Sequence, residues 1–178
     1  MTLPERIGQL RGIFATDEAS QQGSYTSELA PWRSAITQDT HQIVQILSTP
    51  YPSNNLLSSQ EARAHALGVA QQVGMTRPAE FLPAFLDHVL TRPLPQEAVT
   101  SLVATLHHRD AVSKGVGTVK QRHGKPIRDP EREALVIEGA VTFAKSNNPK
   151  MDDLVSEAYI AEAVRMVIDR SCVIQESL

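Results

Sequence analysis

The sequence contains a single cysteine and few aromatic residues, and each scarcity excludes a class of structure. One cysteine, Cys172, excludes a disulfide framework within the chain and a zinc site built from several cysteines. With aromatic residues at 4%, the core must consist mainly of Leu, Ile, Val and Ala, which favours packed helices over a sheet sandwich. We expect Cys172 itself to be a small core residue and not a nucleophile.

The sequence also lacks long apolar runs and a large net charge. No run approaches the roughly 18 apolar residues that a transmembrane helix requires, and residues 1–10 lack the apolar stretch of a secretory signal. We therefore expect no membrane association and a cytoplasmic location. The formal net charge of -3 predicts no overall attraction to nucleic acid.

Apolar residues recur at helical spacing along most of the chain, and residues typical of helix ends separate the apolar stretches. The polar stretch at residues 20–24 is expected to separate two helices. We find no strong strand alternation. The sequence therefore predicts an all-α fold, with one domain over residues 1–178 and about seven helices in an up-down array.

Several helix ends can be assigned from local sequence. Ser58 followed by Glu61 predicts a capping box, and Gly74 is a plausible end for the helix that follows. Asp129 and Pro130 have the order of a cap residue and a first-turn proline. The pair at residues 148–149, Asn then Pro, suggests the same start for the last helix.

The segment at residues 111–128 stands out because it contains no acidic residue. Its glycines and Pro126 are expected to interrupt a helix, so we predict one long, basic interhelical loop. Arg109, just before the segment, extends its basic surface, whereas His107 and His108 are expected to favour the end of the preceding helix. The positively charged side chains within the loop, together with one histidine, are Lys114, Lys120, Arg122, His123, Lys125 and Arg128.

Two interpretations of this loop stay open at this point. In the first, Arg109 and the six loop residues bind the phosphate backbone of a nucleic acid or another polyanion. In the second, the loop is a solvated connector whose charges pair with acids elsewhere, such as Asp152, Asp153 and Glu157.

Signatures of other chemistry are weak or absent in the sequence. The glycines near Lys125 do not have the spacing of a phosphate-binding loop, and no Gly-x-Ser-x-Gly motif occurs. Glu61 and His65 lie four residues apart, but no third ligand at a readable spacing supports a metal site. We therefore predict no metal and no cofactor, although an enzyme built from dispersed residues remains a third possibility.

Our leading hypothesis is a non-enzymatic, self-assembling helical protein that binds nucleic acid, such as a coat or nucleoprotein subunit found in a virion. Homo-oligomerisation would accompany this role. The alternative is a helical adaptor or regulator, of the effector or chaperone type, that binds another protein through an apolar groove.

Overall fold

The computed structural model describes the backbone of residues 3–178 and the side chains of residues 23–178. Within the described chain, six α-helices contain most of the residues, with 77% helical and 3% in strands. The prediction of an all-α fold is confirmed. Two 3₁₀ helices and one pair of short strands complete the secondary structure of the described chain.

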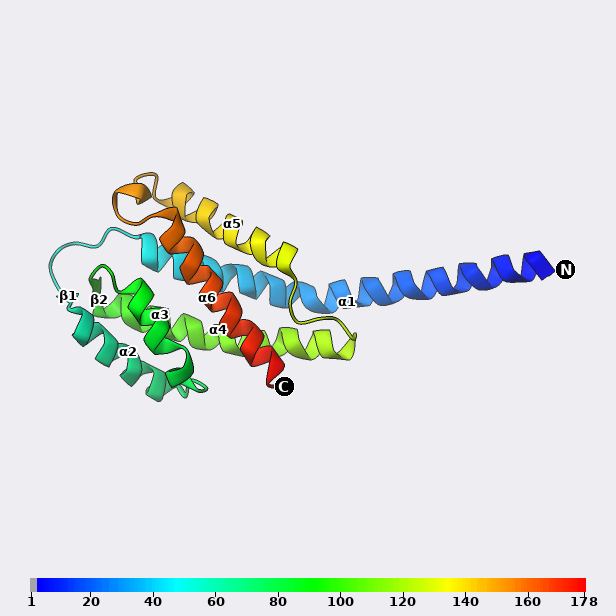
Figure 1. Ribbon diagram of the computed structural model, residues 1–178, viewed down its shortest axis with the longest axis horizontal. Helices are drawn as coiled ribbons and strands as arrows, with labels where there is room; N and C mark the ends of the chain where they lie inside the picture. Colours follow the sequence, from blue (N-terminus) through cyan, green and yellow to red (C-terminus); the bar gives the residue numbers. More distant parts are fainter. Residues whose placement is uncertain (1–2) are drawn as a thin grey trace.

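The longest helix, α1 (Leu3–Ser48), runs without interruption through the polar stretch at residues 20–24. The break predicted there is wrong, because Gln and Ser are tolerated within helices and one glycine costs only about 1 kcal/mol relative to alanine. Figure 1 shows that the N-terminal part of α1 extends beyond the other helices. Its C-terminal half packs against α4 (Gln96–Arg122) and α5 (Pro130–Asn147).

Helix α4 lies antiparallel to α1 and includes most of the segment that we predicted to be a loop (Figure 1). The predicted loop at residues 111–128 is therefore wrong, because residues 111–122 are helical and only residues 123–129 connect α4 to α5. We call residues 123–129 the strap. A Cβ on Gly115 would lie 2.6 Å from ring carbons of Trp32, so this glycine allows close packing of α4 against α1.

Between α1 and α4, a short β-pair closes a smaller helical layer. Strand β1 (Leu56–Leu57) pairs antiparallel with β2 (Leu94–Pro95), and Leu57 lies opposite Leu94. The chain between the strands forms, in order, α2 (Ser59–Val73), η1 (Pro78–Glu80) and α3 (Leu82–Val89).

The ends of α2 agree with the sequence prediction. The hydroxyl of Ser58 accepts a hydrogen bond from the backbone N–H of Glu61, and the Glu61 carboxylate accepts one from the N–H of Ser58. Gly74 ends the helix in the left-handed conformation with φ 72°. Glu61 therefore serves as a cap, and the ring of His65 bonds to Thr100 on α4.

Helix α5 begins as predicted, whereas α6 (Glu157–Glu176) does not. Asp129 caps α5 by accepting a hydrogen bond from the N–H of Arg132 at 3.2 Å. The start of the last helix predicted at residues 148–149 is wrong, because Asn148 ends α5 and η2 (Met151–Asp153) follows. Ser156 caps α6 instead, and its hydroxyl accepts from the N–H of Tyr159.

Two groups of buried apolar side chains hold the helices together. The main core joins α2 and α3 to the C-terminal half of α1, the N-terminal half of α4 and α6, and it includes Ile43, Leu47, Phe85, Leu102, Leu106 and Ile160. The smaller core joins the middle of α1 to the C-terminal half of α4 and consists of Tyr25, Leu29, Val112, Val116 and Val119. A pocket between the helices is lined by members of both cores.

Candidate active site

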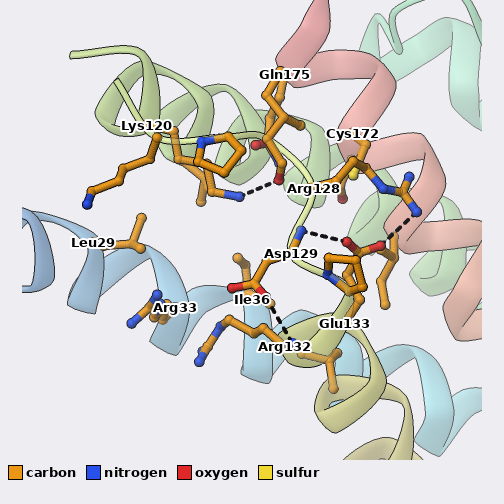
Figure 2. A pocket seen from close by; sticks show the side chains of 18 of the residues that line it. Leu29, Arg33, Ile36, Lys120, Arg128, Asp129, Arg132, Glu133, Cys172 and Gln175 are labelled. Carbon is orange, nitrogen blue, oxygen red and sulfur yellow. Dashed lines mark hydrogen bonds and ion pairs between the residues drawn. The ribbon is translucent and has the colours of Figure 1, made fainter. Parts of the chain in front are cut away.

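The pocket lies where four helices and the strap meet, and it encloses about 430 Å³. Helices α1, α4, α5 and α6 all contribute to its wall, and the strap adds Lys125 to Asp129 (Figure 2). Apolar side chains such as Leu29, Ile36 and Val136 line part of the wall. A pocket of this size and mixed lining suits a small organic molecule.

Cationic side chains outnumber anionic ones in the lining. The two acidic side chains, Asp129 and Glu133, already have partners within the fold. The cations come from α1, α4, α5 and the strap, and they are Arg33, Arg109, Lys120, Lys125, Arg128 and Arg132. The excess positive charge favours an anionic ligand.

Arg109 is the most deeply buried of these cations. Its Nε donates to Ser171 Oγ on α6 at 3.1 Å, and its Nη1 donates to the carbonyl of Ile36 on α1 at 3.0 Å. Burial lowers the pKa of Arg109 to about 10, so the side chain still carries its charge at neutral pH. Arg109 is therefore a fixed positive charge held between three helices.

Lys120 and Arg132 reach the pocket from the ends of two neighbouring helices (Figure 2). Lys120 Nζ donates to the carbonyl of Ile127 in the strap at 2.6 Å. Burial lowers the pKa of both side chains, and the charge of Arg33 lowers each pKa further. Arg33 therefore repels both Lys120 and Arg132, and an anion placed beside Arg33 would relieve that repulsion.

Two buried polar atoms in the lining make no hydrogen bond within the described side chains. They are Arg33 Nε, a donor, and Gln175 Oε1, an acceptor. Gln175 is only 8% exposed and extends from α6 toward the pocket (Figure 2). Because buried polar groups in proteins are nearly always paired, these two atoms are available to water or to a ligand in the pocket.

The acidic lining residues hold the strap and are not free bases. Glu133 Oε1 lies 2.7 Å from Arg128 Nη2, and Glu133 Oε2 accepts from the N–H of Asp129 at 2.9 Å. Arg128 also pairs with Asp169 on α6 at 3.0 Å. Burial raises the pKa of the Cys172 thiol, which makes this lining residue a poor nucleophile.

The structure separates the predicted anion-binding residues into three groups. Four of them line the pocket, namely Arg109, Lys120, Lys125 and Arg128. Arg122 and His123 lie beside it and both bind Glu28 on α1. Lys114 is exposed on the surface of α4 and does not line the pocket.

Sequence analysis missed Arg33, Arg132 and Gln175. Arg33 lies far from the basic segment in the chain, and only the packing of α1 against α4 brings it to the pocket. Arg132 follows the acid-free segment by a few residues, but its acidic neighbours Glu131 and Glu133 placed it outside that pattern. A signal was present in the spacing, since Asp129 as a cap places Arg132 and Glu133 in the first turn of α5.

Neither a metal centre nor a membrane span is found in the described part of the chain. No group of three or more His, Cys, Asp or Glu side chains is arranged there to hold a metal ion. None of the described helices has the length and apolar character needed to cross a bilayer.

The fold and the pocket together define a helical protein with a basic pocket between four of its helices. The family model that matches is chorismate mutase type II, over residues 100–176. That range begins within α4 and includes the strap, α5 and α6, so the matched segment supplies most of the pocket wall. No curated protein and no solved structure matches the chain.

This similarity corrects several predictions made from the sequence. It indicates an enzyme with a small-molecule substrate. The predictions of a non-enzymatic protein, of a coat or nucleoprotein subunit and of binding to RNA or another polyanion are therefore wrong. A location in a virion has no support. The physical reason is that residues 111–122 are part of α4, so four of the residues that we assigned to a basic loop surface instead line a pocket on α4 and the strap.

Proposed function

We propose that the protein is a chorismate mutase that converts chorismate to prephenate in the basic pocket. The observation that carries this proposal is the cluster of Arg33, Lys120 and Arg132, in which Arg33 lowers the pKa of both neighbours and which lines the same pocket as the unpaired Oε1 of Gln175. Chorismate carries two carboxylates and an ether oxygen, which match these cations and polar atoms in charge. The similarity of residues 100–176 to chorismate mutase type II supports the same assignment.

The pocket also suits the chemistry of this conversion. Chorismate and prephenate are isomers, so a C–O bond breaks and a C–C bond forms within one molecule, and no group enters or leaves. Such a reaction requires neither a nucleophile nor a free base, in agreement with the engaged carboxylates and the protonated Cys172. Catalysis would rest on holding the substrate in a reactive conformation and on stabilising charge in the transition state.

The roles follow from where each side chain lies. Arg109 is fixed by Ser171 and Ile36, so it provides a rigid partner for one carboxylate. Arg33 and Arg132 lie near each other (Figure 2) and would hold the other carboxylate. Lys120 and Gln175 would then stabilise negative charge that develops on the ether oxygen as its bond to carbon breaks.

Helix α1 is an essential part of the proposed enzyme although it lies outside the matched range. It contributes Arg33 to the pocket, and its Ile36 carbonyl fixes Arg109. One chain therefore supplies every residue to which we give a role, and we treat residues 1–178 as one functional unit. A cytoplasmic location fits the proposed enzyme, and homo-oligomerisation stays a prediction that light scattering would test.

The direct test is to incubate the purified protein with chorismate and to measure prephenate by chromatography. We expect turnover, and we expect Lys120→Ala to reduce kcat/KM by about 10²–10³-fold, as for the loss of one transition-state donor. Arg165→Ala is the matched control, because Arg165 is an exposed cation on α6 that pairs only with Glu162 among the described contacts. A folded wild-type protein that forms no prephenate above the uncatalysed rate would overturn the proposal.

A further inference from the structure

The strap that covers the pocket is fastened to helices at both of its ends. At its start, Glu28 Oε2 on α1 lies 2.7 Å from Arg122 Nη1 and 3.1 Å from His123 Nε2. The His123 ring packs edge-on against Tyr25 of α1, with 5.3 Å between ring centroids. At its other end, Arg128 binds Asp169 and Glu133.

The contact at Glu28 lies close along the chain to two pocket cations. Glu28 lies five residues before Arg33, just over one turn of α1 away, and Arg122 lies two residues after Lys120 on the last turn of α4. Lys120 in turn donates to the carbonyl of Ile127 in the strap. Glu28 therefore joins α1 to the end of α4 beside the point where Arg33 and Lys120 face the same pocket.

We propose that Glu28 is a positioning residue, which holds the end of α4 and the strap against α1 and so fixes Lys120 relative to Arg33. Glu28 does not line the pocket and would not touch the substrate. Its effect would pass through Arg122, His123 and the hydrogen bond from Lys120 to Ile127. The consequence for catalysis rests on the proposed function, whereas the effect on Lys120 does not.

The ion pair between Glu28 and Arg122 is exposed, so its effect on the position of α4 can be distinguished from an effect on overall stability. The side chains of Glu28 and Arg122 are 34% and 60% exposed, and exposed ion pairs contribute little to stability. The hydrogen bond from His123 lowers the pKa of Glu28, so the carboxylate stays ionised throughout the neutral range. Loss of Glu28 should therefore disturb the pocket without unfolding the protein.

The first experiment measures Lys120 itself, in the protein without substrate. The rate at which an amine-reactive reagent labels each lysine is followed by mass spectrometry in wild type, Glu28→Ala and Glu28→Gln. We expect Glu28→Ala to raise the labelling rate of Lys120 by about five-fold, the size expected when one exposed ion pair is lost. Glu28→Gln, which keeps an acceptor oxygen, should raise it less, and Lys150 should not change.

The matched control is Glu162→Ala, because Glu162 forms an equally short pair with Arg165, also 2.7 Å, within α6. That pair joins no second helix, so Lys120 labelling and the thermal unfolding midpoint should stay at their wild-type values. Glu28→Ala with unchanged Lys120 labelling would overturn the proposal. A general increase that includes Lys145 and Lys150 would also overturn it, because it would indicate loosening of the whole fold.

The second experiment measures turnover of chorismate by the same variants. We expect kcat/KM to fall by about ten-fold in Glu28→Ala and less in Glu28→Gln, because a small displacement of a catalytic group is enough to slow a positioned reaction. If the wild type is inactive but Lys120 labelling still responds to Glu28, the proposed function fails and the positioning role remains. If turnover is present and unaffected by Glu28→Ala, the positioning role fails and the proposed function remains.

Discussion

The two ends of the α1–α4 helix pair are built from the same type of helix but bury different groups. At the end near α2 and α3, Ile43 and Leu47 of α1 pack with Leu102 and Leu106 of α4 in the main core. At the other end, Leu29 and Val116 share the interface with Arg33 and Lys120, which repel each other. We therefore expect the end near α2 and α3 to contribute more to the free energy of unfolding, and the pocket end to contribute more to the proposed binding of substrate.

Polar groups show the same contrast. Arg170 and Asp110, buried between α6 and α4 where the main core ends, form a close pair at 3.0 Å. In the pocket, by contrast, Arg33 Nε and Gln175 Oε1 are buried without a partner among the described residues, and outside it the same holds for His107 Nδ1 on α4. Sites that bind ligands commonly reduce stability in this way, since groups arranged for a ligand are not satisfied by the fold alone. The two ends should therefore respond differently to substitution.

The largest effect is expected in the main core. Phe85 on α3 is fully buried and stacks on Phe81 with 5.0 Å between ring centroids. Replacing Phe85 with Ala should lower the free energy of unfolding by about 3–5 kcal/mol, as measured by urea denaturation. Turnover per folded molecule should not change. A loss of kcat greater than the unfolded fraction explains would show that the two ends are not separable.

The converse is expected for Arg33 in the pocket. Arg33→Leu should reduce kcat/KM for chorismate by about 10²–10³-fold, because one charged partner of the substrate is lost. The free energy of unfolding should stay the same or increase, since Arg132 and Lys120 lose a like charge nearby. Arg165→Leu provides the control for charge alone. Destabilisation by Arg33→Leu comparable with that of Phe85→Ala would contradict the contrast between the two ends.

Gly115 tests the packing that brings the two helices together at the pocket end. A Cβ at this position would lie 2.6 Å from Trp32 ring carbons, so Gly115→Ala should cost about 1–3 kcal/mol and shift the fluorescence of Trp32. Gly139 on α5 provides the control, because a Cβ there would meet nothing within 4 Å. Gly139→Ala should stabilise the protein by about 0.4–1 kcal/mol. Equal effects of the two substitutions would show that close approach does not explain Gly115.

These glycines also show how far the sequence could predict the structure. Features that depend on neighbours in the sequence were predicted correctly, such as the capping box at Ser58 and the start of α5 at Asp129. Gly115 and Gly117 were wrongly predicted to break a helix. A Cβ on Gly115 would meet Trp32 and a Cβ on Gly117 would meet Leu178, and both of these neighbours are distant in the sequence. A glycine required for packing and a glycine that ends a helix look the same in a single sequence.

The residues of the candidate site also fall into a group that the sequence predicted and a group that it did not. Arg109, Lys120, Lys125 and Arg128 were found because they lie in or beside one acid-free segment. Arg33 and Gln175 were missed because only the tertiary packing of α1 and α6 brings them to that segment. Four of the six pocket cations were therefore predictable from sequence, but the packing that gathers all six around a pocket was not. That packing distinguishes a pocket for a small molecule from a basic surface for nucleic acid.

The smallest effect is expected in the dependence on pH, and Lys120 provides it. Burial lowers the pKa of Lys120 from 10.5, so the ammonium should lose its proton below that pH. Binding of an anionic substrate needs the charge, and kcat/KM should therefore fall as pH rises through the pKa of Lys120. Lys120→Arg should move this alkaline limb to higher pH, as measured by pH–rate profiles, and an unmoved limb would assign it to another group, such as Arg109.

Stability should change in the opposite direction over the same range. Between the lowered pKa of Lys120 and 10.5, the unfolded chain binds more protons than the folded one, so the contribution of Lys120 to the free energy of unfolding increases with pH. Below this window its burial penalty is fully present. Comparing denaturation of wild type with that of Lys120→Met cancels the titration of shared groups such as Tyr159 and isolates this contribution. If turnover and stability instead fell together, Lys120 would be a structural cation like those at the main core, and the contrast between the two ends of the helix pair would not hold for it.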